Sequence, residues 1–295
     1  MYEPPLKIDV KRWVERAKDD PVAYLQRQAT EIILNAIALS ADLNEGLYLK
    51  GGVLMGLVYA SPRQTTDIDL TAGFPATADD HEKIREYLDN IFPAAAAGLG
   101  YTDLILKTQS IQRKPRNDNF ETANFPALKL KIAFAKRDSN QAKSLAAGIC
   151  PDVIEVDISF NEPTQKIQLL SLTGGNELRA YSLVDLIAEK YRAMLQQVTR
   201  NRERRQDVYD LDILIKDPEI DAACRKDILE AFIEKCETRD ITPNRASLDD
   251  PEIRKRSSAN WHTLELELGH VPEFDDCFQR VSEFYRSLPW PSATS

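Results

Sequence analysis

The sequence predicts an α+β protein in which a mixed α/β half, residues 1–178, is followed by a helical half, residues 179–295. Up to residue 178, segments with apolar residues at helical spacing alternate with short β-branched segments of period two. From Ser182 onward only the helical spacing recurs. The segment TGGN at 173–176 supplies a short connection between the halves. The chain of 295 residues is long enough to bury well over half of its surface without disulfide or metal staples.

The first half is expected to begin with a helix over residues 21–41, where apolar side chains keep helical spacing. LYLK at 47–50 then indicates a short strand, and a short helix from Val53 opens on Gly51 and Gly52. After the turn SPRQT, the alternation in TDIDLTAGF predicts another strand. The remaining elements of this half are one helix and three strands, at 79–91, 101–112, 127–135 and 153–160.

The second half begins with a capping box, Ser182 to Asp185, which predicts a helix through about Val198. Further helices are expected at 206–215, 222–238 and 273–288.

Composition excludes several classes of protein. With 43% apolar and 29% charged residues the chain is globular rather than disordered. No apolar stretch approaches the roughly 20 residues that cross a bilayer, and the first twenty residues lack the apolar core of a signal peptide. We therefore expect a cytoplasmic protein without membrane contact. No CxxC or HExxH pattern occurs, so a bound metal is expected to be a hard ion held by carboxylates, such as Mg²⁺.

Charge is distributed unevenly along the chain. The net charge of −9 argues against bulk nucleic-acid binding. Two segments nevertheless carry a net charge of +5 each: residues 101–143, which include Arg113, Lys114 and Arg116, and residues 190–205. They could form a polyanion-binding face or two ordinary solvated surfaces.

Asp67 and Asp69 lie two residues apart on an expected strand, so their carboxylates face the same side. Two like charges held close together repel each other, and a divalent cation between them relieves that repulsion. Magnesium bound to a triphosphate is the usual ligand of such a pair, because Mg²⁺ takes one or two carboxylates and completes its coordination shell with phosphate and water.

Gly51 and Gly52 lie about fifteen residues upstream, at an expected junction between a strand and a helix. Glycine lets the backbone approach a bound group, and a helix N-terminus offers N–H groups to phosphate. Alone, the glycine pair could be only a turn, and the DxD only a surface strand. The ordered combination, with Arg63 and Thr66 just before the acids, is more specific for a triphosphate site.

The ordered motif GG…R-x-T-x-D-I-D-L resembles the first motif of the AbiEii/AbiGii nucleotidyltransferase toxins, a branch of the polymerase-β-like nucleotidyltransferases. The superfamily usually has a Gly-Ser pair, and this chain has Gly52 in place of the serine. The spacer between this pair and the DxD motif is longer here than in classical members of the superfamily. The resemblance implies a mixed sheet with flanking helices, followed by a helical domain over residues 179–295 that completes the active site.

The resemblance also implies further site residues. A third acid from a neighbouring strand would be Asp157 in VIEVDISF, which could orient the attacking hydroxyl or act as its base; Glu155 shares its face. A helical lysine followed by D-x-x-D-L corresponds to Lys190, Asp207 and Asp210. Where the family usually has Arg-Asp, this chain has Gln206 before the first of these acids.

Lys190 lies close to the apolar face of its helix and therefore needs an anionic partner, such as a nucleotide phosphate. Alternatively it points outward while its stem covers apolar surface. The two acids share a helix face and could instead pair with Arg204 and Arg205.

The implied reaction is transfer of a nucleoside monophosphate from an NTP to an acceptor hydroxyl. Asp67 and Asp69 would hold Mg²⁺, and Lys190 and Arg63 would neutralise charge. Gly51, Gly52, Thr66 and Asp207 would belong to the nucleotide site. Relatives of this type add nucleotides to the 3′ end of tRNA, which blocks translation, and a cognate antitoxin is a further expected partner. Transfer to a protein or small molecule, or an inactive nucleotide-binding regulatory module, are the alternatives.

Overall fold

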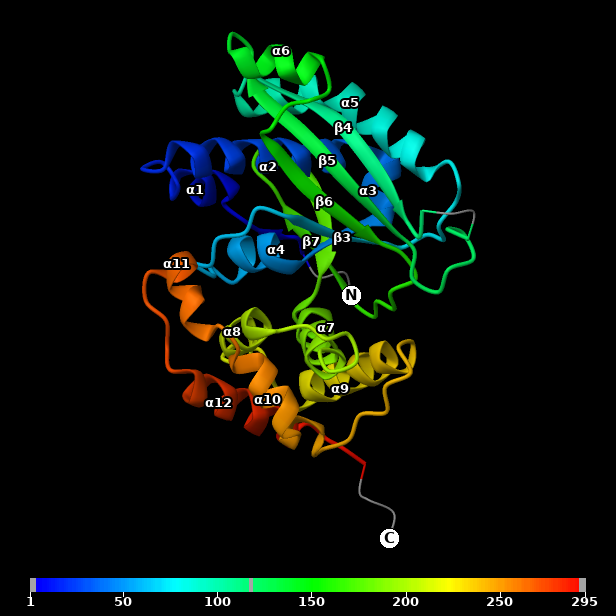
Figure 1. Cartoon of the computed structure of the whole chain (residues 1–295), viewed down its shortest axis with the longest axis vertical. Coiled ribbons are helices and arrows are strands. Elements are labelled where there is room, and N and C mark those ends of the chain that lie inside the picture. Colours follow the sequence, from blue (N-terminus) through cyan, green and yellow to red (C-terminus); the bar gives the residue numbers. More distant parts are fainter. Residues whose placement is uncertain (1–3, 117–118, 292–295) are drawn as a thin grey trace. The chain divides into compact units, whose positions relative to one another are not determined.

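The computed structural model describes residues 4–116 and 119–291. Contacts divide the described chain into two units (Figure 1). The first contains the residues up to Val58 together with Thr65–Glu162 and Ile167–Ala180. The second contains Tyr59–Gln64, Pro163–Lys166 and the residues from Tyr181 onward. The boundary expected between residues 178 and 179 falls within the last strand of the sheet, and the division into two functional domains stays a prediction.

The first unit is built on a mixed sheet of eight strands within the described residues, in the order β1-β7-β8-β2-β3-β6-β5-β4. The strands are β1 (Leu6–Lys7), β2 (Leu47–Lys50), β3 (Ile68–Ala72), β4 (Leu104–Lys114), β5 (Ala127–Lys136), β6 (Val153–Ser159), β7 (Ile167–Ser171) and β8 (Glu177–Tyr181). Strand β3 is antiparallel to β2 and parallel to β6, and β5 is antiparallel to both of its neighbours, β4 and β6. The predicted mixed sheet with flanking helices is confirmed.

Strand β5 shows why this sheet has one apolar and one polar face. Leu128, Leu130 and Ile132 are completely buried, whereas Lys129 and Lys131 between them keep partial exposure. Alternation along a strand separates the two sets. Figure 1 shows α2 and α5 alongside strands β4–β6, and α6 at the end of β5. Helix α6 packs on the lysine-bearing face through Leu145, against Ala133 and Ala135, so it covers only the far end of that face.

The helices of this unit are α1 (Val10–Glu15), α2 (Pro21–Leu39), α3 (Ala41–Gly46), α4 (Gly51–Val58), α5 (Asp80–Leu99) and α6 (Asn140–Ala146). The first predicted helix ends earlier than expected, because the Ser40 hydroxyl accepts from Leu43 N–H and begins α3. Helix α5 runs past the expected end at Ile91, through Pro93, and stops at Gly100, whose φ is +81°. The short strands β1, β7 and β8 are not among the sequence-based expectations.

The second unit is helical over its described residues, as predicted. Its elements are α7 (Leu183–Gln196), α8 (Arg205–Leu214), α9 (Ala222–Glu237), η1 (Ser247–Asp249), α10 (Pro251–Ser258), η2 (Trp261–Leu264), α11 (Glu265–Leu268) and α12 (Phe274–Ser287). Buried Tyr191 contacts the rings of Phe232, Phe284 and Tyr285, with centroids 5.2–6.5 Å apart. This aromatic cluster joins α7, α9 and α12.

The cysteines behave as structural thiols. Cys150, Cys236 and Cys277 are buried and no disulfide joins them. Burial raises the pKa of Cys236 to about 12 and that of Cys277 to about 11. Among the described residues, no helix combines the length and the apolar character that a bilayer span requires.

Candidate functional site

Gly51 places the start of helix α4 directly against a carboxylate of the neighbouring strand. Its φ is +70°, a backbone conformation that residues other than glycine rarely adopt. A Cβ built there would lie 2.1 Å from Oδ2 of Asp69. The glycine is therefore required twice, by the backbone conformation and by the approach of Asp69. The helix begins at this glycine rather than at Val53, and Gly52 is buried in its first turn.

The two predicted metal-binding acids follow the alternation of strand β3. Ile68 and Leu70 are buried, so Asp67 and Asp69 project to the opposite side. Asp67 itself lies just before the strand and is exposed. Its Oδ1 accepts a hydrogen bond of 3.2 Å from the Thr66 hydroxyl. Thr66 thus contacts this carboxylate, and its place in the nucleotide site stays a prediction.

Register extends this arrangement into a charged row across four strands. The Cα of Asp69 in β3 is paired with Lys50 in β2 and with Asp157 in β6. Asp157 is in turn paired with Lys129 in β5. Paired residues share a face of the sheet. The row therefore runs lysine, aspartate, aspartate, lysine, and it brings Asp157 beside Asp69 as the sequence predicts.

Glu155 has a different environment from Asp157. Its Oε2 lies 2.5 Å from Lys129 Nζ and its Oε1 3.7 Å from Lys131 Nζ. The hydrogen bond from Lys129 holds the pKa of Glu155 below its usual value. The same bond raises the pKa of Lys129, with further contributions from the charges of Asp157 and Asp67. Glu155 is thus occupied by lysines, which leaves Asp157 as the better candidate for the third acid.

The carboxylates of Asp67 and Asp69 fit a magnesium ion that is also coordinated by the phosphates of a nucleotide. Carboxylate oxygens are the ligands that Mg²⁺ prefers. Within the described part of the chain, no three His, Cys, Asp or Glu side chains form a cluster that could hold a metal ion. A protein cage for a metal is therefore not formed here. Two carboxylates with phosphate and water would complete the shell.

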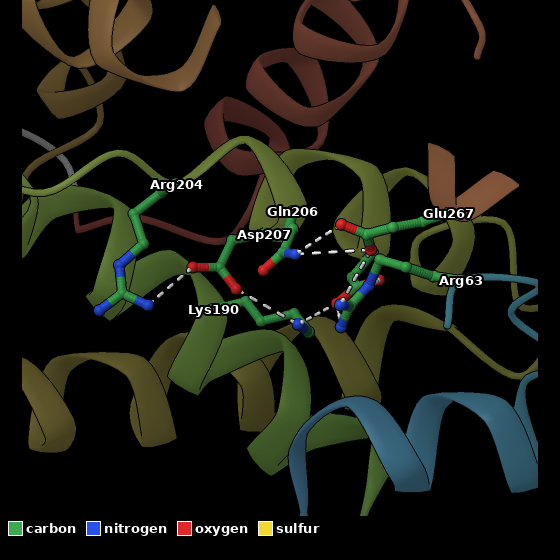
Figure 2. A network of polar contacts seen from close by, with 7 residues as sticks. Arg63, Lys190, Arg204, Gln206, Asp207 and Glu267 are labelled. Atoms are coloured by element: carbon green, nitrogen blue, oxygen red, sulfur yellow. Dashed lines mark hydrogen bonds and ion pairs between the residues drawn. The ribbon is translucent and has the colours of Figure 1, made fainter. Parts of the chain in front are cut away.

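The second unit contains a network of buried charges around Lys190 (Figure 2). Lys190 on α7 donates to Asp210 Oδ2 at 2.6 Å and to Asp207 Oδ1 at 3.3 Å, both on α8. Lys190 thus has the anionic partners that its position predicts, and they come from the chain itself. Burial alone would lower its pKa, but the charges of the two aspartates raise it above the usual value.

Asp210 is also bound by the guanidinium of Arg63. The Nε and Nη2 atoms of Arg63 donate to its two carboxylate oxygens at 3.4 and 3.3 Å. The Asp210 side chain is completely buried. Burial would raise its pKa, yet the charges and hydrogen bonds of Lys190 and Arg63 outweigh this and hold the pKa below its usual value. One buried carboxylate is therefore shared by two buried cations.

Two further contacts complete the network. Glu267 on α11 lies 3.5 Å from Arg63 Nη1 and accepts a 3.1 Å hydrogen bond from Gln206 Nε2. Asp207 also forms an ion pair with Arg204 at 3.5 Å, which is the alternative partner that the sequence predicts for this acid. Figure 2 shows Gln206 and Glu267 pointing toward each other. Gln206 thus binds a carboxylate that also contacts Arg63.

Sequence reasoning missed Lys50, Lys129, Lys131 and Glu267. The lysines at alternate positions of ALKLKIAF carry a signal, since Lys129 and Lys131 must share one strand face. Their opposition to Asp157 and Glu155 depends on strand pairing, which the sequence alone does not give. Glu267 lies in a segment without a recognisable pattern.

The model of one protein family matches residues 32–280, described as "Nucleotidyl transferase AbiEii toxin, Type IV TA system". The chain belongs to this family. It is therefore a nucleotidyltransferase of the AbiEii toxin class. The match spans both the charged row and the network around Lys190. Family membership implies a nucleoside triphosphate substrate and an antitoxin partner.

Solved structures with low sequence identity resemble this AbiEii-family chain. The crystal structure of JHP933 from Helicobacter pylori matches with a TM-score of 0.50 and 12% identity, and covers 91% of this chain and 92% of that chain. MenT4, a nucleotidyltransferase toxin from Mycobacterium tuberculosis, matches with a TM-score of 0.49 and 14% identity, and covers 95% and 99%. The first likeness supports the fold. A search among curated proteins finds no match.

Proposed function

We propose that this AbiEii-family enzyme uses Mg²⁺ to transfer a nucleoside monophosphate from an NTP to the 3′ end of tRNA, and that this inhibits translation and growth. The observation that carries the nucleotide and magnesium part of the proposal is the close approach of the Asp69 carboxylate to Gly51. It joins a glycine-led helix start, which suits phosphate, to a pair of carboxylates, which suits magnesium.

On the sheet, each residue has a role in the proposed reaction. Asp67 and Asp69 would hold the magnesium ion, which when bound supplies positive charge against the triphosphate. Gly51 and Gly52 let the phosphates approach the start of α4. Asp157, paired in register with Asp69, accepts the proton of the acceptor hydroxyl. The hydroxyl oxygen then bonds to the α-phosphorus, the bond to the β-phosphate oxygen breaks, and pyrophosphate leaves.

In the helical unit, Lys190 and Arg63 are the cations that the family motif assigns to the phosphates. Both are already oriented, Lys190 by Asp207 and Asp210 and Arg63 by Asp210 and Glu267. Preorganised cations stabilise developing charge without rearranging during the reaction. Phosphoryl transfer depends mainly on such positioning and electrostatic stabilisation.

The polar face of strands β4 and β5 supports an RNA acceptor. Register places Lys114 and Lys107 of β4 on the same face as Lys129 and Lys131 of β5. Arg113 projects to the other face, where its guanidinium lies 6.0 Å from the ring centre of Phe120. The basic side chains that share a face with Asp157 are therefore these lysines and not all of the arginines in the segment.

A transfer assay tests the proposal. The purified full chain is incubated with Mg²⁺, each labelled NTP in turn and total RNA. We expect label in a tRNA-sized band with the wild-type chain, and a loss of at least 100-fold with Asp69→Asn. Asp103→Asn, a change of an exposed carboxylate before β4, is the matched control and should keep activity.

Other outcomes would replace the proposal. Label on protein instead of RNA would move the acceptor to the protein class, and label on a small acceptor would favour small-molecule transfer. If no label transfers anywhere and NTP binding is unaffected by removing Mg²⁺, the chain is a nucleotide-binding regulatory module.

A further inference from the structure

Lys129 is a charged group beside the proposed carboxylate site that the reaction above does not use. Its Cα pairs with that of Asp157, and its ammonium lies 2.5 Å from Glu155 Oε2. Glu155 is two residues from Asp157 on the same strand, so both acids face the lysine's side of the sheet. Lys129 therefore lies at the end of the row where Asp157 is found.

The position of Lys129 is fixed by its strand and by its partner. Strand β5 is held on both sides, by β4 and by β6, and the flanking Leu128 and Leu130 are completely buried. Glu155 is itself contacted by Lys131 at 3.7 Å on its other oxygen. The ammonium of Lys129 is thus held at Glu155 by a close ion pair.

The charges of the side chains around the row are close to balance before a nucleotide binds. Four carboxylates, those of Asp67, Asp69, Glu155 and Asp157, are accompanied by three lysines, Lys50, Lys129 and Lys131, which gives a net charge of −1. One divalent ion changes this to +1. Two-metal phosphoryl-transfer sites place their ions about 3.5–4 Å apart between shared carboxylates. A second ion beside Asp157 would lie on the face of the sheet from which Lys129 projects.

We propose that Lys129 is a positioning residue that takes the place of a second metal ion beside Asp157, so that the site binds one divalent cation, through Asp67 and Asp69. The inference rests on the proposed function, since it concerns the metal of that reaction. Glu155 serves in this arrangement as the anchor of Lys129.

The test counts Mn²⁺ bound to the full chain by electron paramagnetic resonance of the free ion, in the presence of a non-hydrolysable NTP analogue. Mn²⁺ binds the same oxygen ligands as Mg²⁺. We expect one ion per chain for the wild type. Lys129→Gln should bind a second ion at least tenfold more tightly than the wild type does, and Lys129→Arg, which keeps the charge, should again bind one.

Lys131→Gln is the matched control, because Lys131 also contacts Glu155 but is paired with Glu155 and not with Asp157. It should keep one ion. Circular dichroism and the thermal midpoint show whether each variant is folded.

The inference is overturned if the wild type binds two ions or none, or if folded Lys129→Gln still binds one with no change in the affinity for a second. Its failure can be told apart from failure of the proposed function. Transfer that persists in Asp69→Asn contradicts the function, whereas an unchanged ion count in Lys129→Gln contradicts only the role of Lys129.

Discussion

Asp210 is a single carboxylate that two buried cations share. Its side chain is completely buried, and it accepts from both Lys190 and Arg63. Removing one member of a buried ion pair is far more costly than replacing the whole pair, because the remaining charge stays desolvated. Here the removal of Asp210 would affect two such charges. The residue is therefore important for stability as well as for the proposed chemistry.

We expect Asp210→Asn to lower the free energy of unfolding by about 3 to 5 kcal/mol. Asp207→Asn should cost about 1 kcal/mol, since Asp207 is partly exposed and its contact with Lys190 is longer. Urea denaturation followed by circular dichroism measures both values. Equal losses for the two variants would contradict the central role of Asp210.

The wild type and the Asp210→Asn variant also show how the contribution of Asp210 to stability depends on pH. The pKa of Asp210 in the folded chain lies below its ordinary value, which is about 3.9 in an unfolded chain. The stabilisation is therefore complete above about pH 4 and is lost as the pH falls through the lower folded-state pKa. We expect the difference in unfolding free energy between wild type and Asp210→Asn to be constant from pH 5 to 7 and to shrink below pH 4. A difference that grew on acidification would contradict this sign.

At the scale of elements, helix α7 is anchored by its first turn. Ser182 caps it by accepting from Asp185 N–H, as the sequence predicts. The carboxylate of Asp185, however, does not close the capping box. It accepts instead from the backbone N–H groups of Gln165 and Lys166, and from Lys235 of α9 at 3.0 Å. One acid thus joins α7, α9 and the segment Pro163–Lys166.

Lys235→Met should lower the free energy of unfolding by about 3 to 5 kcal/mol, because Asp185 and Lys235 are both buried. Lys226→Met, on the same helix but exposed, is the matched control and should change it by less than about 0.5 kcal/mol. In the double variant Asp185→Asn with Lys235→Met, the loss should be smaller than the sum of the single losses. Additive losses would show that the two side chains are not coupled.

Elements with strong periodicity were predictable from the sequence, and elements that depend on their neighbours were not. Strands β5 and β6 have clear alternation and lie within a residue or so of their expected bounds. Strands β7 and β8 have only five residues each, and besides each other they pair with the distant strands β1 and β2. Helix α5 passes Pro93 because its alanine-rich end packs as a helix despite the lost hydrogen bond.

The candidate site divides in the same way. The motifs gave Asp67, Asp69, Gly51 and Lys190, because their spacing along the chain is itself the signal. Lys129 could not be assigned, because its relation to Asp157 exists only through the register of β5 and β6. Glu267 contacts Arg63 although about two hundred residues separate them in the sequence, and no local pattern predicts such a contact.

At the scale of the whole molecule, a chain of net charge −9 carries a basic face on strands β4 and β5, and Asp157, the proposed general base, shares that face. We expect the logarithm of the tRNA dissociation constant to depend linearly on the logarithm of salt concentration. The double change Lys114→Gln with Lys131→Gln should reduce this slope by about 2, roughly one for each lysine. Fluorescence anisotropy with labelled tRNA measures the slope.

Arg113→Gln is the control for this surface, because Arg113 lies on the opposite face of β4. Its slope should equal that of the wild type. If the double lysine variant keeps the full slope, RNA does not bind this face.

The interleaving of the two units along the chain also determines which fragments can fold. A polypeptide starting at Tyr181 would contain every named helix of the second unit but neither Tyr59–Gln64 nor Pro163–Lys166. Asp210 would then lack the guanidinium of Arg63, and Asp185 would lack the two backbone donors of Gln165 and Lys166. Both carboxylates are fully buried in the intact chain. Efforts to obtain the helical part by truncation should therefore yield insoluble or partly unfolded protein, whereas supplying the two short segments through designed linkers should restore its folding.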